Sequence, residues 1–551
     1  MKKLLALAFL VLSAVGLLAQ VGNPLRLEIP APANSDPFNY VTAGPYGVCV
    51  FYPTINESGK DSVSWSFVMT DNKLKEQWYR LVPLHKDVTY LKSLSTRNAI
   101  YLLFHDTKRN KDGNIFVFMV IPRLKVITEH RASIPEKADV VDFDISNDVA
   151  YVGFNNRKNQ PGIMGFSLVT GEKNNYVITS EKDALLLDIS LDSVQQKLFA
   201  TYKIQYSSSS NHLYVNQYKI AGPLEKTFDF SGQAEKKNFN SAQYIPKGEG
   251  NGMIAGTYGF NVSNTRRQYD YYDNYYNSYY YNYYSPYYYS RQSGYDADED
   301  KTPVSDGYFT GLVNNGVAGK IKYFNFSGFS NAYKYITDPS ALRLKNKATR
   351  KKEKSATEEQ AEETFDNEKT LNLRLITHEI MIKDGQFIIT SEAYNPEYHT
   401  NTQMSYDYYG RAFPTSYQVF DGFRYSHAFI AGFDSRGNML WKNGMEMRDI
   451  LTKYLNRKLN FVFDKDEIVL FYNANNKVAS KVIKGNTIVD NTSYTSLVAL
   501  RNTDQPIDEY LGTIEHWYGD YFIATGYQTI RNNYLESNKR NVFYISKMAF
   551  R

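Results

Sequence analysis

The sequence predicts an all-β protein built as a β-propeller of seven or eight blades with two long inserted loops. Tyr, Phe, Val and Ile are abundant, and long amphipathic helical periodicity is almost absent, which favours strands. A short unit also recurs along the chain: a polar turn, then a strand of small residues that ends in an aromatic side chain. Copies spaced by about 44 to 56 residues, outside the interrupted stretches, match one four-stranded blade each.

The N-terminus is typical of a secretory signal peptide covering residues 1–19. A basic start (Met1 to Lys3) precedes an apolar run from Leu4 to Leu18 and the small residue Ala19. We therefore expect an exported mature chain, 20–551, that forms a single propeller domain. An N-terminal membrane anchor is the alternative, although the apolar run is shorter than the roughly 20 residues that span a bilayer.

Cys49 is the only cysteine, so the chain can form no internal disulfide, and no cysteine near residue 20 could carry a lipid anchor. It lies in the apolar run 48–52. We expect it to be a buried small hydrophobic residue.

The two clearest copies of the recurrent unit begin 44 residues apart. The turn 144–148 leads into a strand at 149–154, and the turn 188–192 leads into one at 198–202. The other copies lie at 48–52, 99–104, 254–258, 387–390, 468–472 and 522–527. The segments 71–78 and 434–441 each place an Asp seven residues before a Trp across a polar turn, as an outer hairpin of a blade would.

The last strand, 542–550, is predicted to pair beside the first mature strand, 25–29, which would hide both edges of the sheet. The alternative architecture is a series of unrelated hairpins in a sandwich or barrel. An outer-membrane barrel fits less well, because the strands are short and lack a regular ten-residue alternation.

The first predicted insertion, 261–301, contains a tyrosine tract. Thirteen of the 21 residues from Tyr269 to Tyr289 are tyrosine, mostly as adjacent pairs every fourth residue. Tyr, Ser and Asn make adaptable binding surfaces, and Pro286 disfavours a helix. We expect an extended arm that binds a partner or stacks on sugars; the alternative is an inert low-complexity loop. The predicted partner-binding residues are Tyr271, Tyr272, Tyr275, Tyr276, Tyr279, Tyr280, Tyr283, Tyr284, Tyr287 and Tyr288.

The second predicted insertion, 344–369, separates its charges. A basic block at 350–354 precedes an acidic block at 358–363. The stretch is interpreted as a solvated excursion between strands, either a short exposed helix or a disordered loop.

No motif in the sequence specifies a reaction. The eight histidines form no pair with metal-ligand spacing, and neither a Gly-x-Ser-x-Gly elbow nor a phosphate-binding loop is present. The acidic run 296–300 starts like a calcium loop, but Lys301 and Gly307 occupy positions that need glycine and glutamate. We predict no catalytic residue, no metal and no cofactor. Asp142 and Asp144 share one strand face, and are interpreted as anchors of blade turns, with glycosidase chemistry as the alternative.

The charge is nearly balanced. The formal net charge of +5 falls to +3 once Lys2 and Lys3 leave with the signal peptide. This gives no support for nucleic-acid binding, which calls for a clustered basic face.

The segment from Tyr425 to Trp441 resembles a segment of exported, uncharacterised propeller-like envelope proteins of the Bacteroidota, and the Leu-Leu-Ala-Gln at 17–20 is similar to the end of their signal peptides. The resemblance covers about the last third of the chain and brings no catalytic residues. It implies a periplasmic protein among outer-membrane assemblies, such as an accessory subunit of the type 9 secretion translocon. The last segment is typical of a propeller strand rather than a sorting domain, which favours the periplasm over the extracellular alternative.

The resulting hypothesis is a non-enzymatic interaction protein that docks on an outer-membrane protein assembly through the tyrosine arm. The first alternative is a glycan-binding or glycan-cleaving propeller. It predicts acidic side chains converging at one mouth of the ring, whereas Lys and apolar side chains there would oppose it. The second alternative is a purely structural envelope protein.

Overall fold

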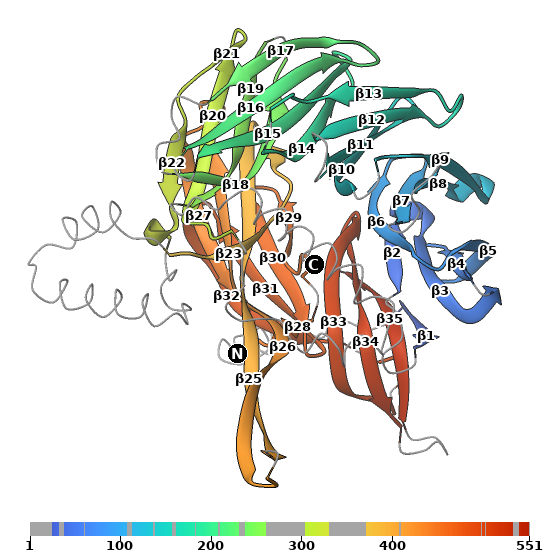
Figure 1. The fold of residues 1–551 in the computed structure, drawn as a ribbon. Coiled ribbons are helices and arrows are strands. Elements are labelled where there is room, and N and C mark those ends of the chain that lie inside the picture. Colours follow the sequence, from blue (N-terminus) through green and yellow to red (C-terminus); the bar gives the residue numbers. More distant parts are fainter. Residues whose placement is uncertain are drawn as a thin grey trace, which may run out of the picture.

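The computed structural model describes residues 25–549 except for 32–37, 60, 107–112, 136–137, 157–160, 182, 208–209, 231–236, 249, 260–302, 330–370, 407–408, 454, 498, 502 and 533–538. Within these described residues the regular structure is strands and short 3-10 turns, without an α-helix. Eight antiparallel sheets form the blades of a β-propeller (Figure 1). The predicted fold class is therefore confirmed. The signal peptide, the tyrosine tract and the charged insertion lie outside the described residues, and those predictions stand as made.

The strands follow chain order within the blades. The first four blades are β2 (Asn39–Thr42), β3 (Val48–Gly59), β4 (Ser62–Thr70) and β5 (Glu76–His85); β6 (Val88–Ser95), β7 (Ile100–Asp106), β8 (Ile115–Ile121) and β9 (Val126–Ala132); β10 (Ala138–Ser146), β11 (Val149–Asn156), β12 (Gly162–Ser167) and β13 (Lys173–Val177); and β14 (Ala184–Asp192), β15 (Lys197–Ser207), β16 (Ser210–Lys219) and β17 (Leu224–Asp229).

The next three blades are β18 (Asn238–Pro246), β19 (Gly252–Gly259), β20 (Gly307–Asn314), β21 (Val317–Ala318) and β22 (Lys322–Asn325); β23 (Arg374–Thr377), β24 (Met381–Lys383), β25 (Gln386–Tyr406), β26 (Ala412–Phe433), β27 (Met439–Glu446) and β28 (Leu451–Thr452); and β29 (Asn460–Asp464), β30 (Glu467–Ala474), β31 (Lys477–Lys484) and β32 (Thr487–Ser496). The closing blade joins β33 (Gln505–Tyr518), β34 (Tyr521–Arg531) and β35 (Lys539–Ala549) to β1 (Leu25–Pro30). The 3-10 turns are η1 (Gly44–Tyr46), η2 (Pro122–Leu124) and η6 (Phe326–Gly328).

The core is divided among the junctions between blades. Eight clusters of buried apolar side chains each join two consecutive blades, including the last and the first. The second strand of a blade packs between two neighbours, so it is buried on both faces; β7, β11 and β19 are almost entirely buried. All eight copies of the predicted recurrent unit fall in these second strands. The recurrent sequence pattern is thus the buried middle of each blade.

Two further predictions about the blades are confirmed. Cys49 is fully buried in β3. The two Asp-to-Trp segments form the turns before the fourth strands, where Asp71 Oδ1 accepts hydrogen bonds from the backbone N–H groups of Lys73 and Lys75 at 2.8 and 2.9 Å. Asp434 Oδ1 accepts the equivalent bonds two and four residues on, both at 2.8 Å. The shared Asp turn explains why both sequences are similar.

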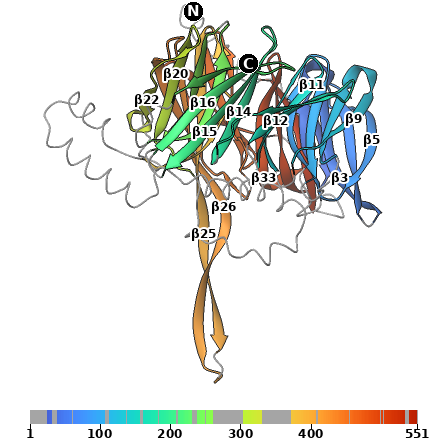
Figure 2. The same ribbon diagram turned by 45° about the horizontal axis from the view of Figure 1, so that its top comes forward.

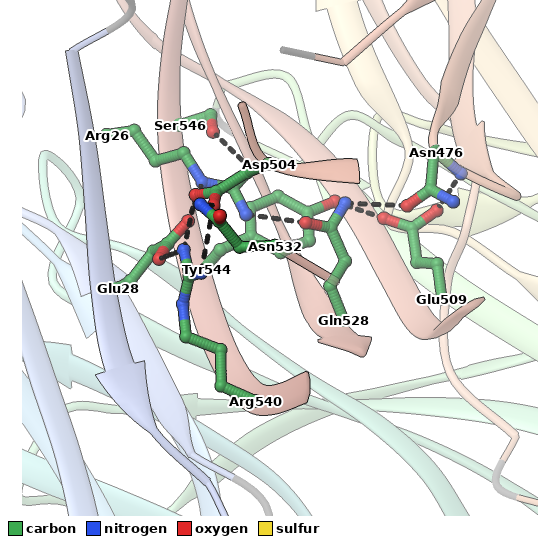
Figure 3. Close-up of polar contacts among 10 residues, drawn as sticks. All are labelled: Arg26, Glu28, Asn476, Asp504, Glu509, Gln528, Asn532, Arg540, Tyr544 and Ser546. Carbon is green, nitrogen blue, oxygen red and sulfur yellow. Dashed lines mark hydrogen bonds and ion pairs between the residues drawn. The ribbon is translucent and has the colours of Figure 1, made fainter. Parts of the chain in front are cut away.

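Strand β1 closes the ring as predicted. It pairs antiparallel with β35 in the register Leu25↔Lys547 to Pro30↔Val542. Figure 3 shows the polar cluster that holds this closure. The fully buried side chain of Arg26 donates to Glu28 at 2.8 Å, to Gln528 at 2.5 Å and to Ser546 at 3.3 Å. Its guanidinium carbon also lies 4.3 Å from the ring centre of Tyr544.

The same cluster extends beyond Arg26. Arg540 bridges Glu28 at 2.8 Å and Asp504 at 2.5 Å, and Asn532 donates to Asp504 at 2.7 Å. Glu509 accepts from the Tyr544 hydroxyl and from the backbone N–H of Asn476, which belongs to the neighbouring blade. We call these ten labelled residues of Figure 3 the closure cluster; they tie the N-terminal strand to the last two blades.

None of the helices in the described part of the chain has the length and apolar character needed to cross a membrane.

Candidate functional site

The long hairpin of β25 and β26 leaves the ring as a projecting arm (Figures 1 and 2). Near the ring, β23, β24, β27 and β28 flank these two strands. Farther out, from Asn395 to Tyr406 and from Ala412 to Gly422, the two strands pair only with each other among the described strands. We call residues 395–422 the arm.

The sequence of the arm favours a ribbon of two strands. Tyr, Thr and Phe make up ten of its 28 residues, and such residues fit a pleated surface. Cross-strand pairs hold it together: Thr402 and Ser416 join their hydroxyls at 2.8 Å, Asn401 donates to Tyr417 at 3.1 Å, and the rings of Tyr398 and Phe420 lie 5.5 Å apart.

Two carboxylates at the foot of the arm are paired with basic side chains. Arg424 donates to both carboxylate oxygens of Glu397, one of them at 2.9 Å, and the pKa of Glu397 is lowered by this contact. His399 pairs with Asp421 at 2.6 Å just beyond. Both pairs lie at the base of the ribbon and are partly exposed to solvent.

The outer part of the arm is almost uncharged and displays apolar side chains. Between Tyr398 and Phe420 only Asp407 and Arg411 carry a charge at neutral pH, with His399 counted as neutral. Met404 is 57% exposed, Phe413 46% and Tyr417 37%. A ribbon with few charges, whose two edges pair with no other described strand, and with exposed apolar side chains is suited to pairing with another polypeptide.

The sequence reasoning missed the arm. In this region we predict one strand from the sequence, at 387–390, and do not predict that the strand continues beyond the ring. The signal was the frequency of Thr and Tyr on both sides of Gly410, from Tyr398 to Tyr417. Strands of 21 and 22 residues are not expected from a propeller whose other second strands have 7 to 12 residues.

A second group of functional side chains lies where the first strands of the blades converge on the axis. Lys92 of β6 contacts Asp142 of β10 at 2.5 Å and Glu379, after β23, at 3.3 Å. Burial disfavours the charge of Lys92, but Asp142 and Glu379 outweigh burial and raise its pKa. The glycan alternative predicts acidic side chains that converge at one mouth of the ring. Two acidic side chains, Asp142 and Glu379, do meet here at Lys92, but Lys92 and Arg457 lie among them.

Asp142 anchors three blades rather than standing ready for acid/base work. Besides Lys92 it accepts from its neighbour Phe143 N at 2.8 Å and from Ile189 N of β14 at 3.3 Å. Burial raises the pKa of the nearby Asp188 carboxyl, and the Asp142 charge adds to this effect. These contacts support the anchoring interpretation for Asp142.

Replacing Asp144 with Asn is expected to stabilise the protein more at pH 7 than at pH 4. Burial raises the pKa of the Asp144 carboxyl to about 6, with Asp142 and Glu379 adding to the effect. Between about pH 4 and 6 the folded state therefore holds a proton that the unfolded state has lost, so wild-type stability falls as pH rises through that window. Urea titrations at both pH values should show Asp144→Asn gaining about 2–3 kcal/mol on the wild type. A difference that does not change with pH would contradict this.

The ten predicted tyrosine contacts, Tyr271 to Tyr288, lie outside the described residues, between β19 and β20. Their predicted role is unchanged. In the described part of the chain, no group of three or more His, Cys, Asp or Glu side chains is arranged to hold a metal ion.

Comparison with known proteins shows only distant similarity. No family model and no curated protein match the chain. Among solved structures, the polysaccharide lyase Uly1 is 10% identical, with a TM-score of 0.35 over 83% of this chain and 89% of the lyase. A prolyl endopeptidase is 6% identical, with a TM-score of 0.33 over 90% of this chain and 54% of that one. A eukaryotic initiation factor is 8% identical, with a TM-score of 0.31 over 89% and 96% of the two chains. At these scores we transfer no activity or partner from them.

Proposed function

We propose that this protein is a non-enzymatic interaction protein of the cell envelope, exported to the periplasm, where it docks on an outer-membrane protein assembly such as a secretion translocon. The observation that carries the docking role is the arm. A two-stranded ribbon that stands alone is marginally stable in water. Its open edges and exposed Met404, Phe413 and Tyr417 favour a partner that covers it.

The partner class follows from the chemistry of the arm. With so few charges, the arm offers little to a nucleic acid or to a strongly charged surface. The outer parts of its two strands pair with no other described strand. Such edges suit β-strand addition, in which main-chain hydrogen bonds give affinity and side-chain pockets give specificity. We therefore propose a protein partner that presents a sheet edge.

Shortening the arm is expected to abolish partner capture and leave the propeller intact. Tyr398 and Phe420 face each other across the ribbon, so residues 399–419 can be replaced by Asn-Gly, which closes a tight hairpin. Tagged wild-type and short-arm proteins are purified from native envelopes in mild detergent. We expect at least a tenfold loss of the near-stoichiometric partner, with the thermal midpoint unchanged.

A photo-crosslinker localises the contact. Placed at Met404 it should join the partner, whereas at Tyr79, equally exposed at 57% on the outer strand β5, it should not. Equal capture by the short-arm protein, or crosslinks of equal yield from both positions, would refute the role of the arm. Deletion of 269–289, made separately, tests whether the tyrosine tract adds a second contact.

Glycan cleavage is not proposed. Asp142 is occupied by Lys92 and two backbone N–H groups, which is the pattern of an anchor.

A further inference from the structure

A cavity of about 400 Å³ lies at the centre of the ring, beside the cluster around Lys92. Its volume falls within the range of roughly 300–1,000 Å³ that is usual for small-molecule sites. It is lined by side chains from the first strands β2, β6 and β33, from the closing blade, and from the segments that contain Glu379 and Arg457.

Part of the cavity lining is aromatic, and its rings are packed against core side chains. Phe38 stacks on Phe543 with ring centres 5.0 Å apart, and its backbone N–H donates to the hydroxyl of Tyr527 at 2.5 Å. Tyr90 packs against Phe51 at 4.9 Å and donates its hydroxyl to Ser93 at 2.9 Å. The rings are thus held by the core before any ligand arrives.

Another part of the lining is charged and contains both acidic and basic side chains. Glu379 lies 3.3 Å from Lys92 and 3.9 Å from Arg457, and Lys92 also contacts Asp142. Burial favours the neutral form of Glu379, yet Lys92 and Arg457 outweigh it and lower its pKa. Two cations thus face two anions, and burial raises the pKa of two further carboxyls beside them, Asp144 and Asp188. The site therefore has no surplus of positive charge to bind an anionic ligand, which favours a neutral one.

A buried carboxylate positions both charged residues of this part of the lining. Glu392 contacts His378, the neighbour of Glu379, at 2.6 Å and accepts from the backbone N–H of Lys458, the neighbour of Arg457, at 2.9 Å. Glu392 is fully buried. The two functional side chains are consequently held on a shared support rather than on independent loops.

We propose that this axial cavity binds a neutral saccharide of one or two rings. Aromatic side chains offer faces for the apolar side of a sugar ring. Glu379 supplies an acceptor for sugar hydroxyls, Arg457 supplies donors, and Thr513, joined to Tyr40 at 3.1 Å, adds a hydroxyl at the edge. This site is separate from the arm and does not depend on the arm's function.

The test is calorimetric titration of the whole mature protein with four probes: maltose, cellobiose, di-N-acetylchitobiose and the anionic dimer digalacturonate. At least one neutral probe should bind, and more tightly than digalacturonate. Glu379→Gln and Arg457→Gln should each weaken that binding at least tenfold. Glu397→Gln, which removes another Arg-paired carboxylate outside the cavity, should leave it unchanged.

Other results would overturn the proposal: no neutral probe binds, digalacturonate binds best, or both cavity variants bind like the wild type. Should Glu379→Gln not fold, Arg457→Gln, at a side chain that is 47% exposed, decides the outcome. The short-arm protein should bind the sugar normally, so this proposal and the arm proposal can fail separately.

Discussion

Arg26→Ala should lower the free energy of unfolding by about 3–5 kcal/mol, the usual effect of removing one partner from a buried charge network. The Arg26 side chain is completely buried, and its loss removes hydrogen bonds to Glu28, Gln528 and Ser546. Gln528 and Ser546 are themselves buried, so water cannot easily replace the missing donor. The stacking over the Tyr544 ring is lost as well.

The loss of stability in Arg26→Ala should be localised where β1 pairs with β35. Hydrogen exchange is expected to speed up first in β1 and β35, since β1 is held to the ring by its pairing with β35 and by the closure cluster. Arg80→Ala is the matched control, because Arg80 is exposed on β5 and, among the described residues, donates only to the carbonyl of Tyr79. It should stay within about 0.5 kcal/mol of the wild type. A loss below about 1 kcal/mol for Arg26→Ala would show that the closure does not depend on the cluster.

Gly47→Ala should destabilise the protein by at least about 3 kcal/mol. Gly47 has φ +121°, a conformation that L side chains rarely adopt, and a Cβ there would lie 1.7 Å from the backbone oxygen of Thr70. Strained backbone of this kind costs about 1–3 kcal/mol, and the overpacking adds a similar amount. The carbonyl of Gly47 also accepts from Trp517 Nε1 at 3.3 Å, so a shift would disturb the junction with the closing blade.

A denaturant titration of Gly385→Ala separates the cost of the left-handed backbone from the cost of overpacking. Gly385 also has positive φ, at +73°, but a Cβ there meets no atom within 4 Å. It should therefore cost only about 1–2 kcal/mol for the left-handed backbone. Equal losses for the two variants would mean that the close approach to Thr70 is relieved by a small movement.

The repeat architecture was predictable because burial leaves a local signature. A second strand packed between two blades must be apolar on both faces, and this gives the recurrent runs such as 149–154 and 468–472. The Asp71 and Asp434 turns were predictable for a similar reason, since an Asp that caps its own following N–H groups acts within a few residues. The closure by residues 25–29 followed from the need to hide both sheet edges.

The sequence by itself thus determined the fold class, the positions of the second strands, the Asp turns, the burial of Cys49 and the strand that closes the ring. All of these features depend on short-range patterns or on the pairing of sheet edges. Only the tertiary structure decided that β25 and β26 run on into an arm, because pairing two strands beyond the ring leaves no burial pattern to read. It also decided that Lys92, Asp142, Glu379 and Arg457 meet at the axis. These residues come from separate blades up to 365 positions apart in the chain, and they meet only when the ring closes.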